Sequence, residues 1–172
     1  MQPSIETPRL LLRPFRLSDS QRVALLAGQK IISDMTANIP HPYTEEMAIE
    51  WIGTHSEKSE HKSAVIYAIT LKESDSIVGA VSFPSLKSGV AILGYWLGTD
   101  YWGKGIALEA SQALIGYAKR ELKVSKVEVQ HLADNHQSCS VIRKLGIQYK
   151  ENRFVQVRGK SREVCVYRSS IA

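Results

Sequence analysis

The chain has 172 residues, 44% of them hydrophobic and 23% charged, a composition typical of one globular domain spanning residues 1–172. No apolar run approaches the roughly 20 residues of a membrane span, and no signal peptide is evident, so we expect a cytoplasmic protein with no membrane partner. The net charge of +5 suits a phosphate-rich ligand, but the basic residues are dispersed and match no nucleic-acid motif, so we expect no direct nucleic-acid binding.

The N-terminal half alternates short apolar runs with capped helical segments. Ser, Thr and Asp accept hydrogen bonds from free N–H groups and so mark helix starts, whereas Pro40 and Pro42 break regular structure. A turn is predicted at Pro84–Gly89. The predicted elements are a strand at Leu10–Phe15, a helix from Ser18 or Asp19 to about Ala27, an irregular segment at Ile31–Tyr43, a helix from Thr44 to about Glu57, and strands at Ala64–Leu71 and Ile77–Phe83.

The second half contains a glycine loop between a strand and a long helix. An apolar run ends at Leu97, Gly103-Lys104-Gly105 follows, and helical spacing of apolar residues begins at Ile106. Glycine lets the backbone approach a ligand, and the unpaired N–H groups of a helix start bind anions, phosphate above all. The remaining predicted elements are a strand at Val127–Leu132, a short helix after Asn135, and a hairpin near Ile147–Phe154 and Val164–Tyr167.

Two other nucleotide-binding fingerprints are excluded. A P-loop requires Gly-Lys followed by Ser or Thr, which Gly103-Lys104-Gly105-Ile106 lacks. A dinucleotide-binding turn requires a third glycine where Leu108 stands. What is left is a short phosphate loop, followed at a distance by Asn135 and Ser138 at the start of another helix.

Two motifs carry a resemblance to a known family. The sequence YWGKGIALEA spans Tyr101 to Ala110, and a second motif, N-x-x-S-x-x-V-x-x-K-x-G, begins at Asn135 and ends at Gly146. Together they resemble motifs A and B of the GCN5-related N-acetyltransferase (GNAT) superfamily, in the branch of ribosomal-protein N-terminal (alanine/serine) acetyltransferases. The segments TPRLLLRPFRLSD and IPHPYTEEMAIEWI resemble the same branch, so the resemblance covers nearly the whole chain.

The resemblance implies a fold and a co-substrate. The fold is a single α/β GNAT-like domain with a mixed, mostly antiparallel central sheet, helices on both faces, and a V-shaped gap between the fourth and fifth strands. The co-substrate is acetyl-CoA, with its pantetheine arm in the gap and its pyrophosphate on the glycine loop. The implied acetyl-CoA-binding residues are Leu97, Trp102, Gly103, Lys104, Gly105, Ile106, Ala107 and Asn135.

The resemblance also implies acetyl transfer to an amine. A protein N-terminal α-amine is the leading acceptor, expected to enter between Ile31–Tyr43 and the Arg153–Arg162 hairpin. A small amine (polyamine, amino acid or antibiotic) is the runner-up. The alternative to an enzyme is a catalytically silent CoA-binding module. A homodimer is possible, and the sequence leaves the oligomeric state open.

Catalytic roles are less sharply indicated. By resemblance, Ser138 donates a hydrogen bond to the leaving thiolate; the alternative is an ordinary serine in a first helical turn. Asn135 suits pantetheine through its amide, and it equally suits a helix N-cap. Cys139 lies near the same helix start, where a thiol pKa can fall, but packing is the favoured interpretation. The two cysteines, Cys139 and Cys165, do not have metal-ligand spacing, and we expect no metal site.

The general base is left open. The chain departs from the superfamily at Asp100, which precedes the glycine loop where Gln or Arg is usual and is expected to turn outward or cap the helix. It also has Gln130 where some members place a glutamate base and Ile142 where many place a tyrosine acid. The candidates for a base are His131, Glu109, Glu151 and ordered water. Tyr95 and Trp96 are interpreted as core residues, with pocket lining as the alternative.

Overall fold

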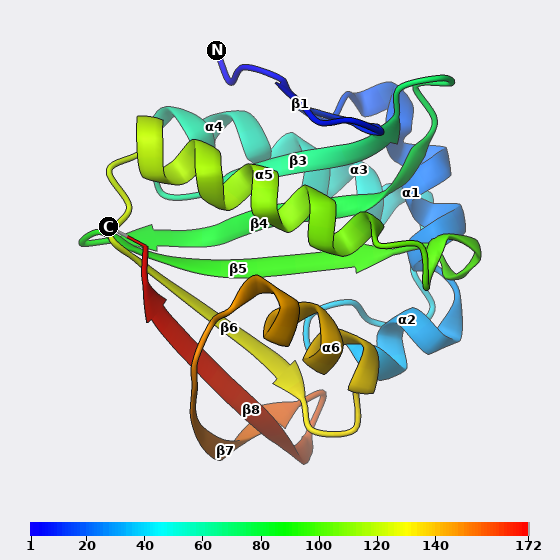
Figure 1. Ribbon diagram of the computed structural model, residues 1–172. Coiled ribbons are helices and arrows are strands. Elements are labelled where there is room, and N and C mark those ends of the chain that lie inside the picture. Colours follow the sequence, from blue (N-terminus) through cyan, green and yellow to red (C-terminus); the bar gives the residue numbers. More distant parts are fainter. Residues whose placement is uncertain (172) are drawn as a thin grey trace.

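An eight-stranded sheet organises the protein in the computed structural model, which describes residues 1–171 (Figure 1). The strand order is β1-β2-β3-β4-β5-β6-β8-β7, and every neighbouring pair is antiparallel except β5 and β6. The strands are β1 (Ile5–Glu6), β2 (Leu10–Arg13), β3 (Val65–Leu71), β4 (Ile77–Lys87), β5 (Val90–Leu97), β6 (Lys126–Leu132), β7 (Tyr149–Val157) and β8 (Lys160–Ser170).

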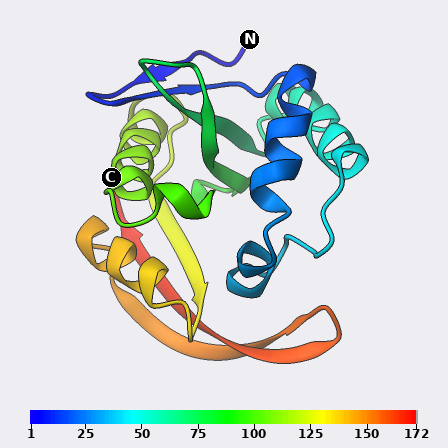
Figure 2. The ribbon, with the colours of Figure 1, turned by 90° about the vertical axis from the view of Figure 1, so that its right-hand side faces the viewer.

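Helices cover both faces of this sheet. Figure 2 shows α5 and α6 on one side and α1 to α4 on the other. The helices are α1 (Ser20–Ala27), α2 (Lys30–Met35), α3 (Glu45–Gly53), α4 (His55–Glu60), α5 (Ile106–Glu121) and α6 (His136–Leu145), with single 3-10 turns at Leu17–Asp19 and Thr99–Tyr101. None of the helices within residues 1–171 is long and apolar enough to cross a membrane.

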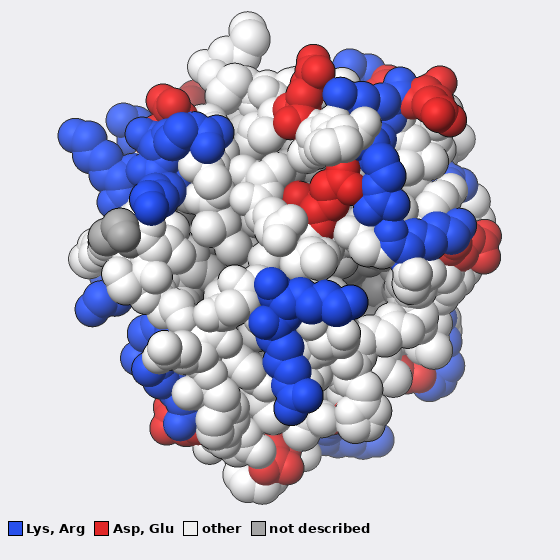
Figure 3. Space-filling model, in the orientation of Figure 1, with Lys and Arg blue, Asp and Glu red and all other residues white. Residues whose placement is uncertain are grey.

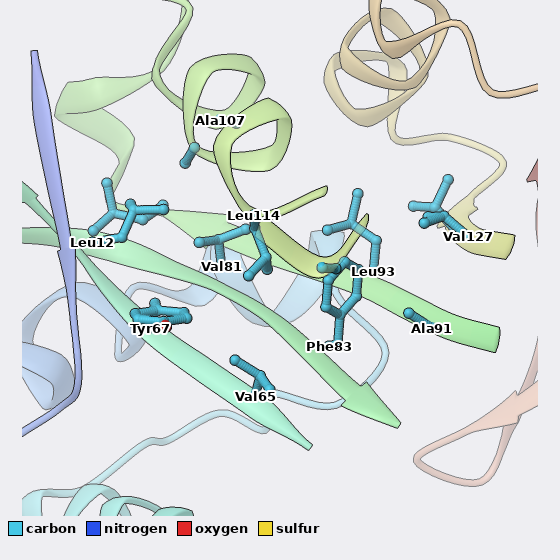
Figure 4. Close-up of a cluster of buried hydrophobic side chains, with 14 of the residues drawn as sticks. Leu12, Val65, Tyr67, Val81, Phe83, Ala91, Leu93, Ala107, Leu114 and Val127 are labelled. Carbon is cyan, nitrogen blue, oxygen red and sulfur yellow. The ribbon is translucent and has the colours of Figure 1, made fainter. Parts of the chain in front are cut away.

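The main core lies between α5 and the central strands. Tyr67, Val81 and Phe83 from β3 and β4 are fully buried there, and Leu114 of α5 packs onto them (Figure 4). Six of the seven residues of β3 are buried, because helices cover the strand on both sides. This packing fixes α5, and with it the glycine loop, against the sheet.

The predicted V-shaped gap is present between β5 and β6. These strands pair in parallel from Val90↔Lys126 to Leu93↔Val129, and the last four residues of β5 have no partner in β6. Figure 1 shows the two strands diverging beyond this point, with α6 in front of the opening. Counted from β2, they are the fourth and fifth strands, so the predicted fold class is confirmed.

Several boundaries differ from the sequence-based predictions. The irregular segment Ile31–Tyr43 contains most of α2, because the prolines constrain only its second half. Thr44 caps a helix as predicted, accepting from the Met47 N–H at 3.3 Å. That helix ends at Gly53 and a separate one begins at His55. At the break, the Thr54 hydroxyl donates to the Trp51 carbonyl at 2.8 Å.

Two further details of local structure differ from the predictions. Asp19 occupies the N-cap position of α1, but its side chain does not cap this helix: its carboxylate accepts from the Arg16 N–H at 2.7 Å and from the Arg13 guanidinium at 2.8 Å. Pro84 does not end β4, which continues to Lys87. An irregularity in the β4–β5 register between Ser82 and Ser85 leaves the proline, which has no N–H, outside the ladder.

Candidate active site

The glycine loop is held in a conformation that favours glycine. Gly103 has a φ of +73° and Gly105, which precedes the first residue of α5, has a φ of +74°. A Cβ added at Gly103 would meet no atom within 4 Å, so the loop is open on that side. The first N–H groups of an α-helix have no partner within the helix, and the loop therefore presents free donors beside an accessible backbone.

Side chains within the loop are divided between core and surface. Ile106 and Ala107 are buried, with 4% and 8% of their surface exposed, so only their backbone N–H groups can meet a ligand. Lys104 is exposed and its ammonium lies 5.7 Å from the centre of the Tyr101 ring. Asp100 is exposed, as predicted, which keeps its negative charge turned outward from the fold.

A network from the N-terminal strands supports the loop. Arg9 donates from its guanidinium to the Lys104 carbonyl at 2.7 Å. Glu109 accepts from Thr7 Oγ1 at 2.6 Å, from the Arg9 N–H at 2.9 Å and from Arg9 Nε at 2.6 Å. Burial raises the pKa of Glu109, but the hydrogen bonds from Thr7 and Arg9 outweigh it and lower the pKa below its usual value. Glu109 is thus a bracing residue rather than a candidate base.

The loop is also tied to the end of β5. The Trp102 indole N–H donates to the Leu97 carbonyl at 2.9 Å, and Leu97 is 7% exposed. This bond occupies the Leu97 carbonyl with a protein donor and brings both residues to the mouth of the gap. Acetyl-CoA contacts at Leu97 and at loop residues Trp102–Ala107 stay predictions.

Asn135 and Ser138 lie on the other side of the gap, at the start of α6. Asn135 Oδ1 accepts from the Ser138 N–H at 3.1 Å, and its Nδ2 donates to the Met35 carbonyl at 3.0 Å. Both ends of the Asn135 amide are therefore engaged: one caps α6 and the other joins it to α2. This geometry matches the N-cap interpretation, and a contact with pantetheine stays a prediction.

The structure brings Tyr95 of β5 to Ser138, which the sequence had not suggested. The Tyr95 hydroxyl donates to Ser138 Oγ at 3.1 Å across the gap. Trp96, the next residue, points to the opposite face and packs near Val23 and Leu26. Of the two aromatics at the end of β5, Trp96 is thus a core residue and Tyr95 places a polar group at the gap.

The face that carries the gap is rich in positive charge. Figure 3 shows basic side chains over α6 and beside the start of α5. Arg143 and Lys144 belong to the last turn of α6, and Lys104 precedes α5. A phosphate-rich ligand would therefore meet a favourable field as well as the free N–H groups.

Comparison with known proteins agrees with this geometry. The family model described as an acetyltransferase (GNAT) domain matches residues 9–148, which include the glycine loop and α6. The chain belongs to the GNAT acetyltransferase family. GNAT enzymes use acetyl-CoA as co-substrate, so the protein is an acetyl-CoA-dependent N-acetyltransferase.

Individual proteins that are similar to this chain are also N-acetyltransferases. N-acetyltransferase p20 of Bacillus licheniformis is 29% identical over 98% of this chain and 95% of its own. The ribosomal protein uS5 alanine N-acetyltransferase of Escherichia coli K12 is 25% identical over 56% of this chain and 52% of its own. The structure of RimL, a ribosomal L7/L12 alpha-N-protein acetyltransferase in complex with coenzyme A, has a TM-score of 0.89 over 98% of both chains at 19% identity, which shows a shared fold.

Gln130 and Ile142 occupy positions where other GNAT enzymes have an acid or a base. Neither side chain is available for proton transfer at the gap. Gln130 donates to Glu128 at 3.0 Å, and Glu128 is itself paired with Arg153 and Arg168. Burial raises the pKa of Glu128, but the bonds from Arg168 and Gln130 outweigh it and lower the pKa. Ile142 is fully buried. None of these residues offers a free base at the gap.

The other candidate bases are no better placed. His131 is 6% exposed, and its Nδ1 lies 2.7 Å from the Leu132 carbonyl, which can only accept, so Nδ1 carries the proton. Its Nε2 then accepts from the Tyr167 hydroxyl at 3.2 Å. Cys139 Sγ lies 3.8 Å from the same hydroxyl, and Glu151 is exposed on β7. His131 is therefore a satisfied structural histidine.

One arginine joins the two segments that were predicted to flank the acceptor. Arg158, at the tip of the β7–β8 hairpin, has its guanidinium 2.7 to 3.3 Å from carbonyl oxygens of the α2 segment, and Figure 2 shows the hairpin curving toward α2. The two segments predicted to flank the acceptor are therefore in direct contact. The accepting carbonyls belong to Ser33, Thr36, Ala37 and Ile39.

Proposed function

We propose that this GNAT enzyme acetylates the α-amine of a protein or peptide N-terminus. The observation that carries the proposal is the engagement of the candidate bases near the gap. His131 and Glu109 have their polar atoms satisfied by protein partners, and Glu151 is exposed on β7. A site built this way suits an acceptor that supplies neutral amine by itself. An α-amine has a reference pKa of about 7.7–8.0, against about 10.4 for lysine.

The relatives support the same class of acceptor. One is named for acting on an alanine of ribosomal protein uS5, and RimL is named an alpha-N-protein acetyltransferase of ribosomal L7/L12. The contact between the α2 segment and the hairpin also supports it. An extended chain end would fit alongside these two joined segments more readily than a folded protein surface carrying a lysine.

The chain's own residues would divide the work in a simple way. Acetyl-CoA supplies an activated acetyl thioester. The backbone N–H groups of Trp102–Ala107 would hold its pyrophosphate, and the splayed end of β5 would hold its pantetheine arm. Ser138 would donate a hydrogen bond to the sulfur as negative charge develops there. Orientation of the two substrates by the gap would supply much of the remaining rate.

Paired peptides test the acceptor. One peptide carries a free N-terminus and no lysine, and its match is blocked at the N-terminus and contains one lysine. We expect faster CoA release with the free N-terminus near neutral pH. Activity on the lysine peptide alone would overturn the α-amine assignment, and activity only on polyamines or aminoglycosides would assign a small-molecule acceptor. Absence of CoA release with every amine would favour a CoA-binding module.

A further inference from the structure

The Tyr95 hydroxyl spans the open end of the gap. The last β5–β6 pair is Leu93↔Val129, so Tyr95 lies on the part of β5 that has left its neighbour. Its hydroxyl oxygen is 3.1 Å from Ser138 Oγ and 3.4 Å from the Ser138 carbonyl oxygen. The contact thus joins β5 to the first turn of α6 where a pantetheine arm would pass.

Tyr95 is the donor in both of its contacts with Ser138. The shorter contact, 3.1 Å, is to Ser138 Oγ, and the Ser138 carbonyl oxygen, which can only accept, lies at 3.4 Å. Burial raises the pKa of Tyr95 to about 12, which keeps the phenol protonated and a donor at neutral pH. Tyr95 therefore gives its proton to the bond and uses an acceptor lone pair of Ser138 Oγ.

The Ser138 proton is left available as a result. Serines in helices commonly donate to a carbonyl one turn earlier. Within residues 1–171, Ser138 Oγ donates to no such carbonyl, and it accepts a hydrogen bond from Tyr95. With one lone pair held by the phenol, rotation of the hydroxyl is restricted and its proton points away from Tyr95.

We infer that Tyr95 is a positioning residue for catalysis, which holds the Ser138 hydroxyl with its proton free to donate to the sulfur of CoA. No proton moves to or from Tyr95, because the phenol only orients its neighbour. The inference rests on the proposed role of Ser138. It also explains how the chain orders this site although Ile142 occupies the position where many relatives carry a tyrosine on α6.

A double-mutant cycle tests the coupling. Tyr95→Phe removes only the hydroxyl and is expected to lower kcat about 3- to 10-fold, the range for loss of one orienting hydrogen bond. The KM for acetyl-CoA should change less than twofold. In a Ser138→Ala background, Tyr95→Phe should have little further effect on kcat. Equal effects in both backgrounds would overturn the inference.

A second measurement does not need an acceptor. Titration of bound CoA by thiolate absorbance reports the thiol pKa in the complex, and a donor at the sulfur lowers it. Ser138→Ala and Tyr95→Phe should each raise the pKa of bound CoA, and the double variant should match Ser138→Ala. If the protein acetylates no amine, the proposed function is wrong. The titration still tests the role of Tyr95, because it needs only bound CoA. An identical thiol pKa in native protein and Tyr95→Phe would contradict it.

Tyr67→Phe is the matched control. Tyr67 is another buried phenol, and its hydroxyl donates to the Pro3 carbonyl at 2.7 Å in the core under α5. Loss of that hydroxyl should lower the melting temperature without changing kcat or the pKa of bound CoA. A general loss of packing would affect Tyr67→Phe and Tyr95→Phe alike, whereas positioning of Ser138 affects only the second.

Discussion

At the scale of single residues, backbone conformation and hydrogen-bond direction define the candidate site. Gly103 and Gly105 have φ values that L-residues adopt at a cost, and the open space above Gly103 is where a ligand would lie. Ser138 shares its helix with several polar residues, yet it is the one joined to Tyr95 across the gap. Substitutions at these positions therefore separate ligand contact from stability.

Gly103→Ala is expected to weaken acetyl-CoA binding at least tenfold, because the new Cβ occupies the open side of the loop. The left-handed conformation should also cost about 1–2 kcal/mol of stability. Gly146→Ala is the control, since Gly146 has a φ of +75° and equal free space at the end of α6. Isothermal titration should show unchanged affinity for Gly146→Ala. Equal affinities in both variants would contradict a phosphate loop.

Ser138→Ala is expected to lower kcat by at most roughly 100-fold, the low end for loss of a donor to developing charge. The affinity for acetyl-CoA should change little, because the donor acts as the thiolate forms. Steady-state kinetics with calorimetry separate the two effects. Ser140→Ala, an exposed serine on the same helix, should leave kcat unchanged. Near-normal kcat for Ser138→Ala would reduce Ser138 to a helix-start residue.

At the scale of elements, the site depends on contacts that join segments distant in sequence. Arg9 and Glu109 fix the loop to the N-terminal strands, and Asn135 joins α6 to α2. Arg158 joins the β7–β8 hairpin to the same α2 segment. These bonds hold the two walls of the gap, the α2 segment and the hairpin in one arrangement.

Arg158→Ala is expected to raise the KM for the acceptor peptide several-fold, because the hairpin loses its bonds to the α2 carbonyls. Acetyl-CoA affinity should be unchanged, since Arg158 is remote from the glycine loop in sequence and in its contacts. Lys160→Ala, an exposed substitution on the same hairpin, is the control. If Arg158→Ala and Lys160→Ala give the same KM for the acceptor peptide, the contact between the hairpin and α2 plays no part in acceptor binding.

At the scale of the whole molecule, one histidine with buried ring nitrogens links stability to pH. His55 packs edge-on against Phe15 and Trp51, and both of its ring nitrogens are buried without a hydrogen-bond partner within residues 1–171. Burial, with a smaller contribution from Lys58, lowers the pKa of His55 to about 4. The unfolded chain therefore binds a proton at this histidine near pH 6.5, whereas the folded state binds it only at a lower pH.

The free energy of unfolding should consequently fall as the pH drops from about 6.5 toward 4, by up to about 3 kcal/mol from this group. Above pH 6.5 the ring is neutral in both states and contributes no pH dependence. Urea unfolding at several pH values measures the slope. His55→Leu should flatten it between pH 6.5 and 4, whereas exposed His61→Gln should not. Parallel slopes for native protein and His55→Leu would refute this account.

Features that depend on neighbours in sequence were predictable from the sequence. Glycines before an apolar-periodic run predicted the loop and α5, Asn135 predicted a helix cap, and the two GNAT motifs predicted the fold with its gap. The loop and the cap rest on interactions within a few residues, such as a cap bond over three positions, whereas the fold and its gap were implied by the resemblance to the GNAT family.

Tertiary structure decided what lies between segments far apart in the chain. The Tyr95–Ser138 bond spans 43 positions, and the bonds Arg9–Lys104 and Asn135–Met35 span 95 and 100. Continuation of β4 past Pro84 likewise needed β5 as a partner to define the register. Packing of α5 and α6 on a splayed sheet sets these pairs, and no local pattern encodes a distance between two strands that have separated.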